Sequence, residues 1–409
     1  MPRRHAKWYD ARNLTKTPEL AVHRIYLDHN ATTPPTSTVV QAMARALAED
    51  WGNPSSVHHF GQQAKAVVDQ ARASVAALIG AEPTEVVWTT GGTESDNLAL
   101  RGAAEALFPA GRRHVVVSAI EHEAVLNTAK ALAKRGWELT LLPVGGEAIV
   151  DPDALDDVLT DRTALVSVMH ANNEVGTIQP VQELARRAHA RGALFHTDAV
   201  QSAGKVPLDV KTLGVDMLSL SAHKFSGPKG TGALWVRRGL RLVPQMTGGK
   251  HERSRRAGTE NVAGIVGMGV AAAEAASMLD AEATRLAALR DDLEARVLAS
   301  VPGTVRNGAP TPRVPNTTNI SFDRIEAESL LIALDLEGFA VSTGSACSSG
   351  TLEPSHVLRA MGLPAHRTQN SIRFSLGKTN TADDVDALVR VLPSVVEKLR
   401  RLSRAPART

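Results

Sequence analysis

From residue 36 to residue 260 the sequence alternates short apolar runs with longer segments in which apolar residues recur every three or four positions. Short apolar runs suit buried strands, and the longer spacing suits helices that cover a sheet. Regular alternation of the two is typical of βα units, so we expect an α/β fold with a mostly parallel sheet. The expected strands are residues 86–89, 114–118, 165–169, 194–197, 217–220 and 233–236.

The character of the sequence changes after Asn261. An alanine-rich stretch over residues 262–301 predicts one long connecting helix, and short strands are expected at 319–322, 339–342 and 371–376. A chain of 409 residues exceeds the roughly 250 to 300 at which one core stops growing, so two domains are expected. We divide the chain into an N-terminal extension (1–24), a large domain (34–281), and a smaller α+β domain (25–33 with 282–409).

Polar residues follow several of the expected strands. His122, Asn173, Asp198 and Lys224 each lie just past the end of one. In open α/β sheets ligands bind outside the carboxyl ends of the strands, so these four side chains indicate a binding site. Taken singly, each of them has a more ordinary interpretation as a hydrogen-bonded structural residue.

Lys224 lies in a polar turn with Ser221 and His223, ahead of a glycine-rich loop. A lysine amine can bond to an aldehyde cofactor, and the neighbouring hydroxyl and imidazole can hold a phosphate. Most loop lysines are solvated surface charges, so the assignment depends on its surroundings. Those include a Gly91-Gly92 turn before a helix expected to open at Thr93, whose free amides attract phosphate. Thr93 and Asp96 also resemble a capping box, which would make this an ordinary capped helix.

Composition indicates a folded globular protein and excludes few functions. Hydrophobic residues make up 43% of the chain and charged residues 22%, which is close to the average. A net charge of +3 is small for this length, so we expect no nucleic acid or anionic membrane as partner. We find no run approaching the ~18 consecutive apolar residues of a spanning helix, no secretion signal and no set of metal ligands. Cys347 is the single cysteine, which suits a reducing, cytoplasmic location and leaves that thiol either inert or reactive.

Ten ordered motifs carry a resemblance to a known family. They are YLDHNATTP from Tyr26, GNPSS from Gly52, GGTESDN from Gly91, EH at Glu121, MHANNE from Met169, HTDAVQ from His196, SAHK from Ser221, RRAGTEN from Arg255, STGSACSSG from Ser342 and SIRFSLG from Ser371. From residue 25 to residue 402 the chain resembles cysteine desulfurases that supply sulfur for iron–sulfur clusters. These are aminotransferase-like enzymes of pyridoxal-phosphate fold type I, so the resemblance implies a seven-stranded sheet in the large domain and pyridoxal 5'-phosphate as cofactor.

The resemblance also implies roles for individual residues. Lys224 would bond to the cofactor, His122 would stack on its ring, Asp198 would face the ring nitrogen and Gln201 the ring hydroxyl. A further set would hold the phosphate, the last member coming from a second subunit of a homodimer: Thr93, Ser221, His223 and Thr259. Arg373 would clamp the substrate carboxylate with two parallel donors, assisted by Asn173. A cross-strand ion pair is the alternative for Arg373.

Cys347 matches the nucleophile of that family. The implied reaction converts L-cysteine to L-alanine, with Lys224 and His122 handling protons and Cys347 taking the sulfur as a persulfide for acceptor proteins. Gly344 and Gly350 flank a run of small residues, so we expect this segment to move. Two other interpretations stay open: another fold type I enzyme, such as a selenocysteine lyase or an aminotransferase, and a non-catalytic cofactor-binding partner. The acceptor is undecided between iron–sulfur assembly, nitrogenase maturation, thiocofactor synthesis and transfer RNA thiolation.

Overall fold

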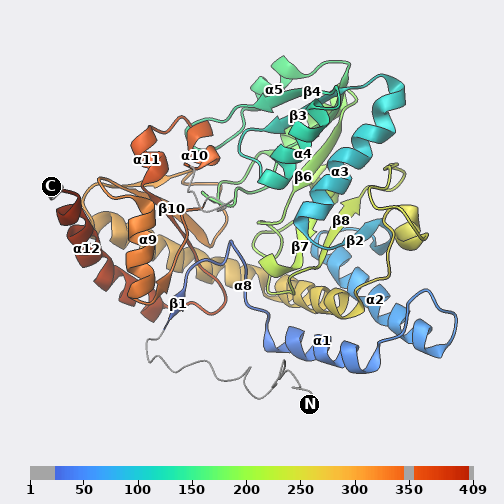
Figure 1. The fold of residues 1–409 in the computed structure, drawn as a ribbon, viewed down its shortest axis with the longest axis horizontal. Coiled ribbons are helices and arrows are strands. Elements are labelled where there is room, and N and C mark those ends of the chain that lie inside the picture. Colours follow the sequence, from blue (N-terminus) through green and yellow to red (C-terminus); the bar gives the residue numbers. More distant parts are fainter. Residues whose placement is uncertain (1–23, 345–353, 405–409) are drawn as a thin grey trace, which may run out of the picture.

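The structure is a computed structural model that describes residues 24–344 and 354–404. Its centre is a seven-stranded sheet made of β2 (Val86–Thr89), β3 (His114–Ser118), β4 (Glu138–Leu142), β5 (Thr163–Ser167), β6 (Leu194–Asp198), β7 (Met217–Ser221) and β8 (Gly232–Val236). The strand order is β2-β8-β7-β6-β5-β3-β4, and only the two pairs made by β8 are antiparallel. The predicted α/β fold with a mostly parallel seven-stranded sheet is therefore confirmed (Figure 1).

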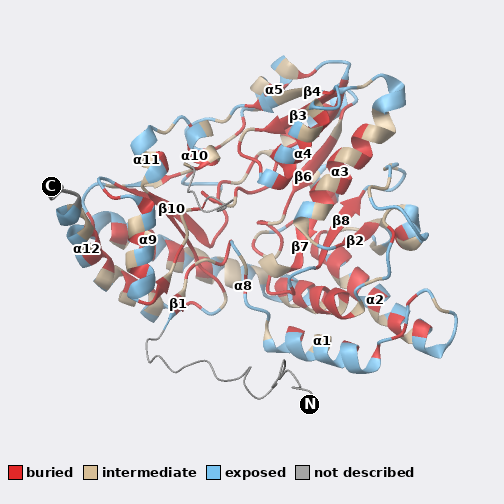
Figure 2. Ribbon diagram, viewed as in Figure 1, coloured by how far each residue is buried: buried red, intermediate tan, exposed pale blue. Residues whose placement is uncertain are grey.

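Helices cover both faces of this sheet. They are α1 (Ser37–Glu49), α2 (His59–Leu78), α3 (Gly92–Leu107), α4 (Glu123–Ala133), α5 (Pro152–Val158), α6 (Val181–Ala190) and α7 (Val210–Leu213), with short 3-10 turns η2 (Pro83–Glu85), η3 (Phe108–Ala110), η4 (Ala222–Lys224) and η5 (His251–Ser254). Alternate residues of a strand face opposite sides, so Val116 joins the core with α2 and α6, while Val115 and Val117 join that with α3 and α4. In Figure 2 the strands of this sheet other than β4 are buried and the outer faces of the helices are exposed.

A second core lies at the other end of the molecule. It holds an antiparallel sheet of β9 (Thr304–Asn307), β10 (Thr317–Phe322) and β12 (Ser371–Ser375), and a parallel pair of β1 (Ile25–Tyr26) with β11 (Phe339–Ala340). Its helices are α9 (Ala327–Leu336) and α12 (Ala382–Arg404), and α11 (Ala365–Gln369) contacts β10. The helix α10 (His356–Ala360) packs instead in a smaller cluster with Ile120 and Met169. Residues 25–28 thus pack against segments more than 300 positions later, because β1 pairs with β11 and Asp28 bridges to Ser375.

One helix, α8 (Val262–Ser300), connects the two cores and contributes buried residues to each. Within the described part of the chain it is the one helix apolar and long enough, by length and composition, to cross a membrane. This does not contradict the expectation that no run approaches ~18 consecutive apolar residues, because Glu274 interrupts the stretch. Half of its most apolar stretch is buried in the protein, where it packs on α1 and α2. The predicted domain division at residues 281 and 282 falls inside this helix and stays a prediction.

The boundaries of most elements were close to those expected. The strands at 86–89 and 114–118 were predicted to the residue, whereas that expected at 165–169 runs from Thr163 to Ser167. Three strands were not predicted: β1, β4 and β9. The strands β4 and β9 lie at a sheet edge and carry exposed residues, so they lack the continuous apolar run of a central strand, and β1 is only two residues long.

Candidate active site

A cavity of about 510 Å³ opens at the carboxyl ends of the central strands, between the two cores. Nine of the residues predicted to bind cofactor or substrate line it: Thr93, His122, Asn173, Asp198, Gln201, Ser221, His223, Lys224 and Arg373. The structure thus brings together side chains spread over 280 positions, as the rule for open α/β sheets led us to expect. Its volume lies within the roughly 300 to 1,000 Å³ of small-ligand pockets.

Two predicted residues are not placed in this cavity. Thr259 is exposed and does not line it, which leaves open the prediction that Thr259 serves a second subunit. Cys347 lies outside the described residues. Gly344 and Pro354, the described residues on either side of the segment that contains Cys347, both line the cavity.

Lys224 ends the short turn η4 that follows β7, which directs its side chain to the strand ends. Its Nζ donates to the carbonyl oxygens of Asn30 at 2.7 Å and Ala31 at 2.8 Å. Burial, followed by the charge of Arg373, lowers the pKa of the Lys224 amine to about 8, while Asp198 and Asp28 oppose the shift. A lysine with this pKa has an appreciable neutral fraction near neutral pH, and a neutral amine is the nucleophilic form.

Asp198 and His122 lie across from one another at the ends of β6 and α4. Asp198 is 5% exposed and its Oδ1 accepts from the backbone amide of Val200 at 2.9 Å. Burial raises the pKa of the Asp198 carboxyl, and the charges of His122 and Lys224 partly offset that. His122 is the N-cap of α4, and its Nδ1 accepts from the amide of Ala124 at 3.1 Å.

The start of α3 forms a cradle of backbone amides. Its N-cap is Gly91, whose φ of 153° suits glycine, and no side chain caps the helix. A Cβ at Gly92 would meet the Val200 side chain at 2.9 Å, so only glycine leaves this approach open. The expected capping box of Thr93 with Asp96 was wrong: Asp96 is buried, and Glu94 instead accepts from the Thr90 amide and hydroxyl at 2.8 and 2.6 Å.

Ser221 and His223 face the same cradle from the end of β7. His223 Nδ1 lies 3.1 Å from the hydroxyl oxygen of Thr32. Burial, followed by the charges of Lys224 and Lys229, lowers the pKa of His223 to about 4, so its ring is neutral at physiological pH. Unused amides of a helix start, a serine hydroxyl and a neutral imidazole together are suited to a phosphate group.

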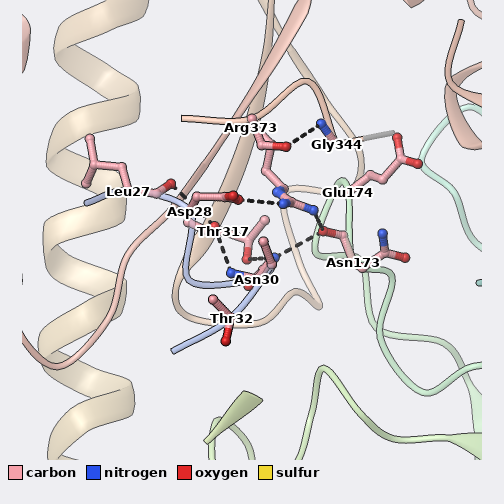
Figure 3. A network of polar contacts seen from close by, with 12 residues as sticks. Leu27, Asp28, Asn30, Thr32, Asn173, Glu174, Thr317, Gly344 and Arg373 are labelled. Atoms are coloured by element: carbon pink, nitrogen blue, oxygen red, sulfur yellow. Dashed lines mark hydrogen bonds and ion pairs between the residues drawn. The ribbon is translucent and has the colours of Figure 1, made fainter. Parts of the chain in front are cut away.

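Arg373 of β12 reaches the cavity from the second core (Figure 3). Its guanidinium donates to Asp28 Oδ1 at 2.7 Å and to the carbonyl of Asn173 at 2.8 Å, and its Nε has no protein partner among the described residues. The side chain is only 4% exposed. The predicted alternative of an ion pair is therefore partly correct, since Asp28 is such a partner, yet donors remain for a carboxylate ligand.

Glu174 lies beside Gly344 and Ser355, which are on either side of the segment that contains Cys347. Its Oε2 accepts from the hydroxyl of Ser355 at 2.5 Å, and a Cβ on Gly344 would meet the Glu174 side chain at 3.2 Å. Burial raises the pKa of this carboxyl, and the Ser355 hydrogen bond opposes the change. Glu174 therefore contacts both stems of the segment 345–353.

Several acidic and amide side chains near the cavity were not predicted to have a role. Asp28, Asn30 and Glu174 stood inside quoted motifs, and so did Asp96 and Glu121. Burial raises the pKa of Glu121 to about 8, and for Asp96 burial and the nearby Asp198 charge raise the pKa well above its usual range. A polar residue inside an otherwise apolar strand–turn segment is the signal that could have found them.

The residues present fit pyridoxal phosphate. The cavity offers an amine with a lowered pKa, a carboxyl at a strand end, an imidazole, and an amide cradle in which a Cβ at Gly92 would meet Val200. Among the described residues there is no cluster of three His, Cys, Asp or Glu side chains able to hold a metal ion. The chemistry of this donor set therefore matches an anionic aldehyde cofactor.

Comparisons with known proteins agree with this geometry. Residues 25–388 match the family described as aminotransferase class V. The cysteine desulfurase IscS of Dictyoglomus turgidum is 49% identical over 379 residues, covering 93% of this chain and 96% of that protein. The cysteine desulfurase NifS of Azotobacter vinelandii is 47% identical over 380 residues, covering 93% and 94%. A solved structure described as a NifS-like protein has a TM-score of 0.87 at 37% identity, covering 92% of this chain and all of that one.

Proposed function

Because the chain belongs to the class V aminotransferase family, we propose that it is a pyridoxal-phosphate-dependent cysteine desulfurase, which converts L-cysteine to L-alanine and passes the sulfur to acceptor proteins. The observation that carries this proposal is the single cavity in which the Lys224 amine, the Asp198 carboxyl and the Arg373 guanidinium meet. Relatives named cysteine desulfurase match 93% of this chain at nearly 50% identity, which supports the same activity here.

Bound pyridoxal phosphate supplies an aldehyde that bonds to an amine and a ring that withdraws electrons from the substrate carbon when its proton is lost. Lys224 would hold the aldehyde and afterwards take the proton at its Nζ, for which a pKa of about 8 is suitable. Asp198 would keep the ring nitrogen protonated, and His122 would cover the ring and share in proton movement. Gln201 would donate to the ring oxygen, and Thr93, Ser221 and His223 would hold the phosphate.

Arg373 would bind the substrate carboxylate. Its guanidinium is fixed by Asp28 and the Asn173 carbonyl and keeps unused donors, so it is pre-oriented for a bidentate contact. The side chain of Asn173 lines the same cavity and would assist. Binding the carboxylate here would orient the substrate sulfur toward the part of the cavity lined by Gly344 and Pro354.

Cys347 would take the sulfur. The thiolate attacks the substrate Sγ, the substrate Cβ–S bond breaks with its electron pair on carbon, and protonation of that carbon gives alanine and a persulfide on Cys347. An acceptor protein, such as an iron–sulfur scaffold, would then remove the outer sulfur. We place this reaction in the cytoplasm, where thiols stay reduced.

A homodimer is part of the proposal. Thr259 is exposed and outside its own cavity, as expected of a residue that completes the phosphate site of a second copy. Three apolar side chains are exposed at and before the start of α2: Trp51 is 65% exposed, Val57 92% and Phe60 48%, with the Trp51 and Phe60 rings 5.0 Å apart. Exposed apolar patches of this kind mark interaction surfaces.

The test uses the purified holoenzyme with L-cysteine and measures alanine and enzyme-bound persulfide. Wild type should form both, whereas Cys347→Ser should bind the cofactor with unchanged absorbance and form neither. Ser394→Ala, at an exposed position of α12, is the matched control. Alanine release by Cys347→Ser equal to that of wild type would refute the role of Cys347. A wild type that only transfers the amino group to a keto acid would refute the desulfurase assignment and support an aminotransferase.

A further inference from the structure

Lys205 is a buried lysine that the proposed reaction does not use. It follows β6 in the turn that also contains Gln201, and it is 8% exposed. Its Nζ donates to Gln201 Oε1 at 2.7 Å and to Asn30 Oδ1 at 3.0 Å. Both partners are neutral amides, and no carboxylate of the described residues forms an ion pair with it. Burying an amine without an acid partner costs free energy of folding, so we expect the role of Lys205 to lie in its hydrogen bonds.

The first consequence concerns the amide of Gln201. The Nζ of Lys205 donates to the Gln201 amide, so the oxygen of that amide faces Lys205. The Nε2 of the same amide then points away, where it donates to the Asn30 carbonyl at 3.0 Å. Gln201 lines the cavity, so Lys205 determines that this residue presents N–H donors to the site rather than an oxygen.

The second consequence concerns Asn30. Its Oδ1 accepts from Lys205 and from Asn316 Nδ2 at 3.1 Å, so its own Nδ2 is directed to Thr317 Oγ1 at 2.8 Å and to the Asn173 carbonyl at 3.1 Å. The backbone carbonyl of Asn30 is the acceptor for the Lys224 amine at 2.7 Å. Lys205 is therefore connected to Lys224 through a single intervening residue, which has no free rotation of its amide.

We propose that Lys205 is a positioning residue of the cofactor site, which fixes the Gln201 amide so that its N–H donors face the cofactor ring oxygen and holds the Asn30 carbonyl in place for Lys224. This inference rests on the proposed cofactor, but it needs no assumption about the substrate.

The hydrogen bonds of Lys205, and not its charge, determine the direction of the expected effect. Burial, followed by the charges of Lys224 and Arg373, lowers the pKa of Lys205 well below its usual range. Burial, then Lys205, lowers the pKa of His29 to about 4. The acids that face Lys224 are Asp198 and Asp28.

Losing Lys205 releases the Gln201 amide to turn its oxygen toward the cofactor ring. Loss of an N–H donor at the ring oxygen favours a proton on the nitrogen that joins Lys224 to the cofactor. Removing Lys205 should therefore raise the pKa at which the visible absorbance of the bound cofactor changes.

The test titrates that absorbance against pH in the holoenzyme without substrate. Lys205→Met should retain cofactor and move the apparent pKa upward by at least about half a pH unit. Lys205→Gln, which keeps an N–H donor, should give a smaller upward shift, and Lys211→Met, at an exposed position of α7, should give none. An apparent pKa equal to that of wild type in Lys205→Met would overturn the proposal.

A double variant tests whether the effect passes through Gln201. In a Gln201→Ala background, loss of Lys205 should add less than half of the shift that it causes alone, and a full additive shift would overturn this route. If neither lysine variant folds, Gln201→Ala decides alone: it should raise the apparent pKa, and an unchanged value would refute the inference. A wild type that binds cofactor but makes no alanine would refute the proposed function and leave this test valid.

Discussion

The two sides of the cavity are built in different ways. One side, which we call the strand-end wall, consists of His122, Asp198, Ser221, His223 and Lys224. Each of its members lies at or a few residues past the end of β3, β6 or β7, so one sheet places them all. Their positions follow from local connections within a single rigid element.

The other side, the junction wall, consists of four residues that line the cavity, Asn30, Asn173, Glu174 and Arg373, together with Asp28, which accepts from Arg373 (Figure 3). It is assembled from three distant segments by hydrogen bonds such as those of Arg373 with Asp28 and of Asn30 with Thr317. No single element fixes it, and it depends on the contact between the two cores. The difference suggests that the strand-end wall holds the cofactor firmly, whereas the junction wall makes substrate binding sensitive to how the cores meet.

The largest effect should come from the strand-end wall. Lys224→Ala removes the amine that holds the cofactor and moves the proton, so alanine formation should fall by at least about a thousandfold. The cofactor should also lose the absorbance that depends on its bond to Lys224. Lys229→Ala, outside the cavity, is the control. Retention of more than about a tenth of the wild-type rate would show that another group moves the proton.

A smaller loss of activity, which acts mostly on KM, is expected when the junction wall is changed. Arg373→Lys keeps a positive charge but loses the planar fork, so kcat/KM for L-cysteine should fall about a hundredfold, mostly through KM. The bound cofactor should keep its absorbance, because the strand-end wall is untouched. Steady-state kinetics of Arg373→Lys, compared with the exposed control Arg390→Lys, show whether the loss is confined to substrate binding by the junction wall. A fall in kcat with unchanged KM would contradict carboxylate binding by Arg373.

The same contrast explains what the sequence could predict. Lys224 and Asp198 could be located because a strand ends beside each of them, and strand ends are visible as the limits of apolar runs. The partners of Arg373 could not, since Asp28 is 345 positions away and only the fold brings them together. The prediction of a capping box from Thr93 and Asp96 was wrong for a related reason. The spacing of a capping box is a local pattern, whereas Asp96 is buried beside His196, with its Oδ1 3.6 Å from His196 Nε2.

Folding stability should respond most strongly where the junction wall is densest. Asn30 is 1% exposed and its side chain bonds Thr317, Asn316, Lys205 and the Asn173 carbonyl. Asn30→Ala removes one hydrogen-bond partner from each of these buried groups, so the free energy of unfolding should fall by about 2 to 4 kcal/mol. Denaturant unfolding of the cofactor-free protein measures it.

Asn97→Ala is the matched control, since the Asn97 side chain makes one bond, to the Thr93 carbonyl at 2.9 Å within α3. It should cost about 0.5 kcal/mol or less. Equal losses in the two variants would mean that the contact between the cores contributes little, and the distinction between the walls would then be geometric only.

The smallest effect tests whether the two walls are coupled through charge. Only the neutral Lys224 amine attacks an aldehyde, and its pKa of about 8 is lowered by burial first and by Arg373 second. Cofactor capture by the cofactor-free protein should therefore accelerate about fivefold between roughly pH 7 and 8 and level off above roughly pH 9, whereas a lysine of ordinary pKa would keep accelerating. Stopped-flow absorbance measures the rate of cofactor capture, with a free amine as control for ionisation of the cofactor.

Arg373→Met removes a positive charge, so Lys224 should hold its proton to higher pH and the whole pH profile of cofactor capture should shift toward alkaline values. A profile that stays in place would show that burial alone lowers the pKa and that the junction wall exerts no electrostatic control over the strand-end wall.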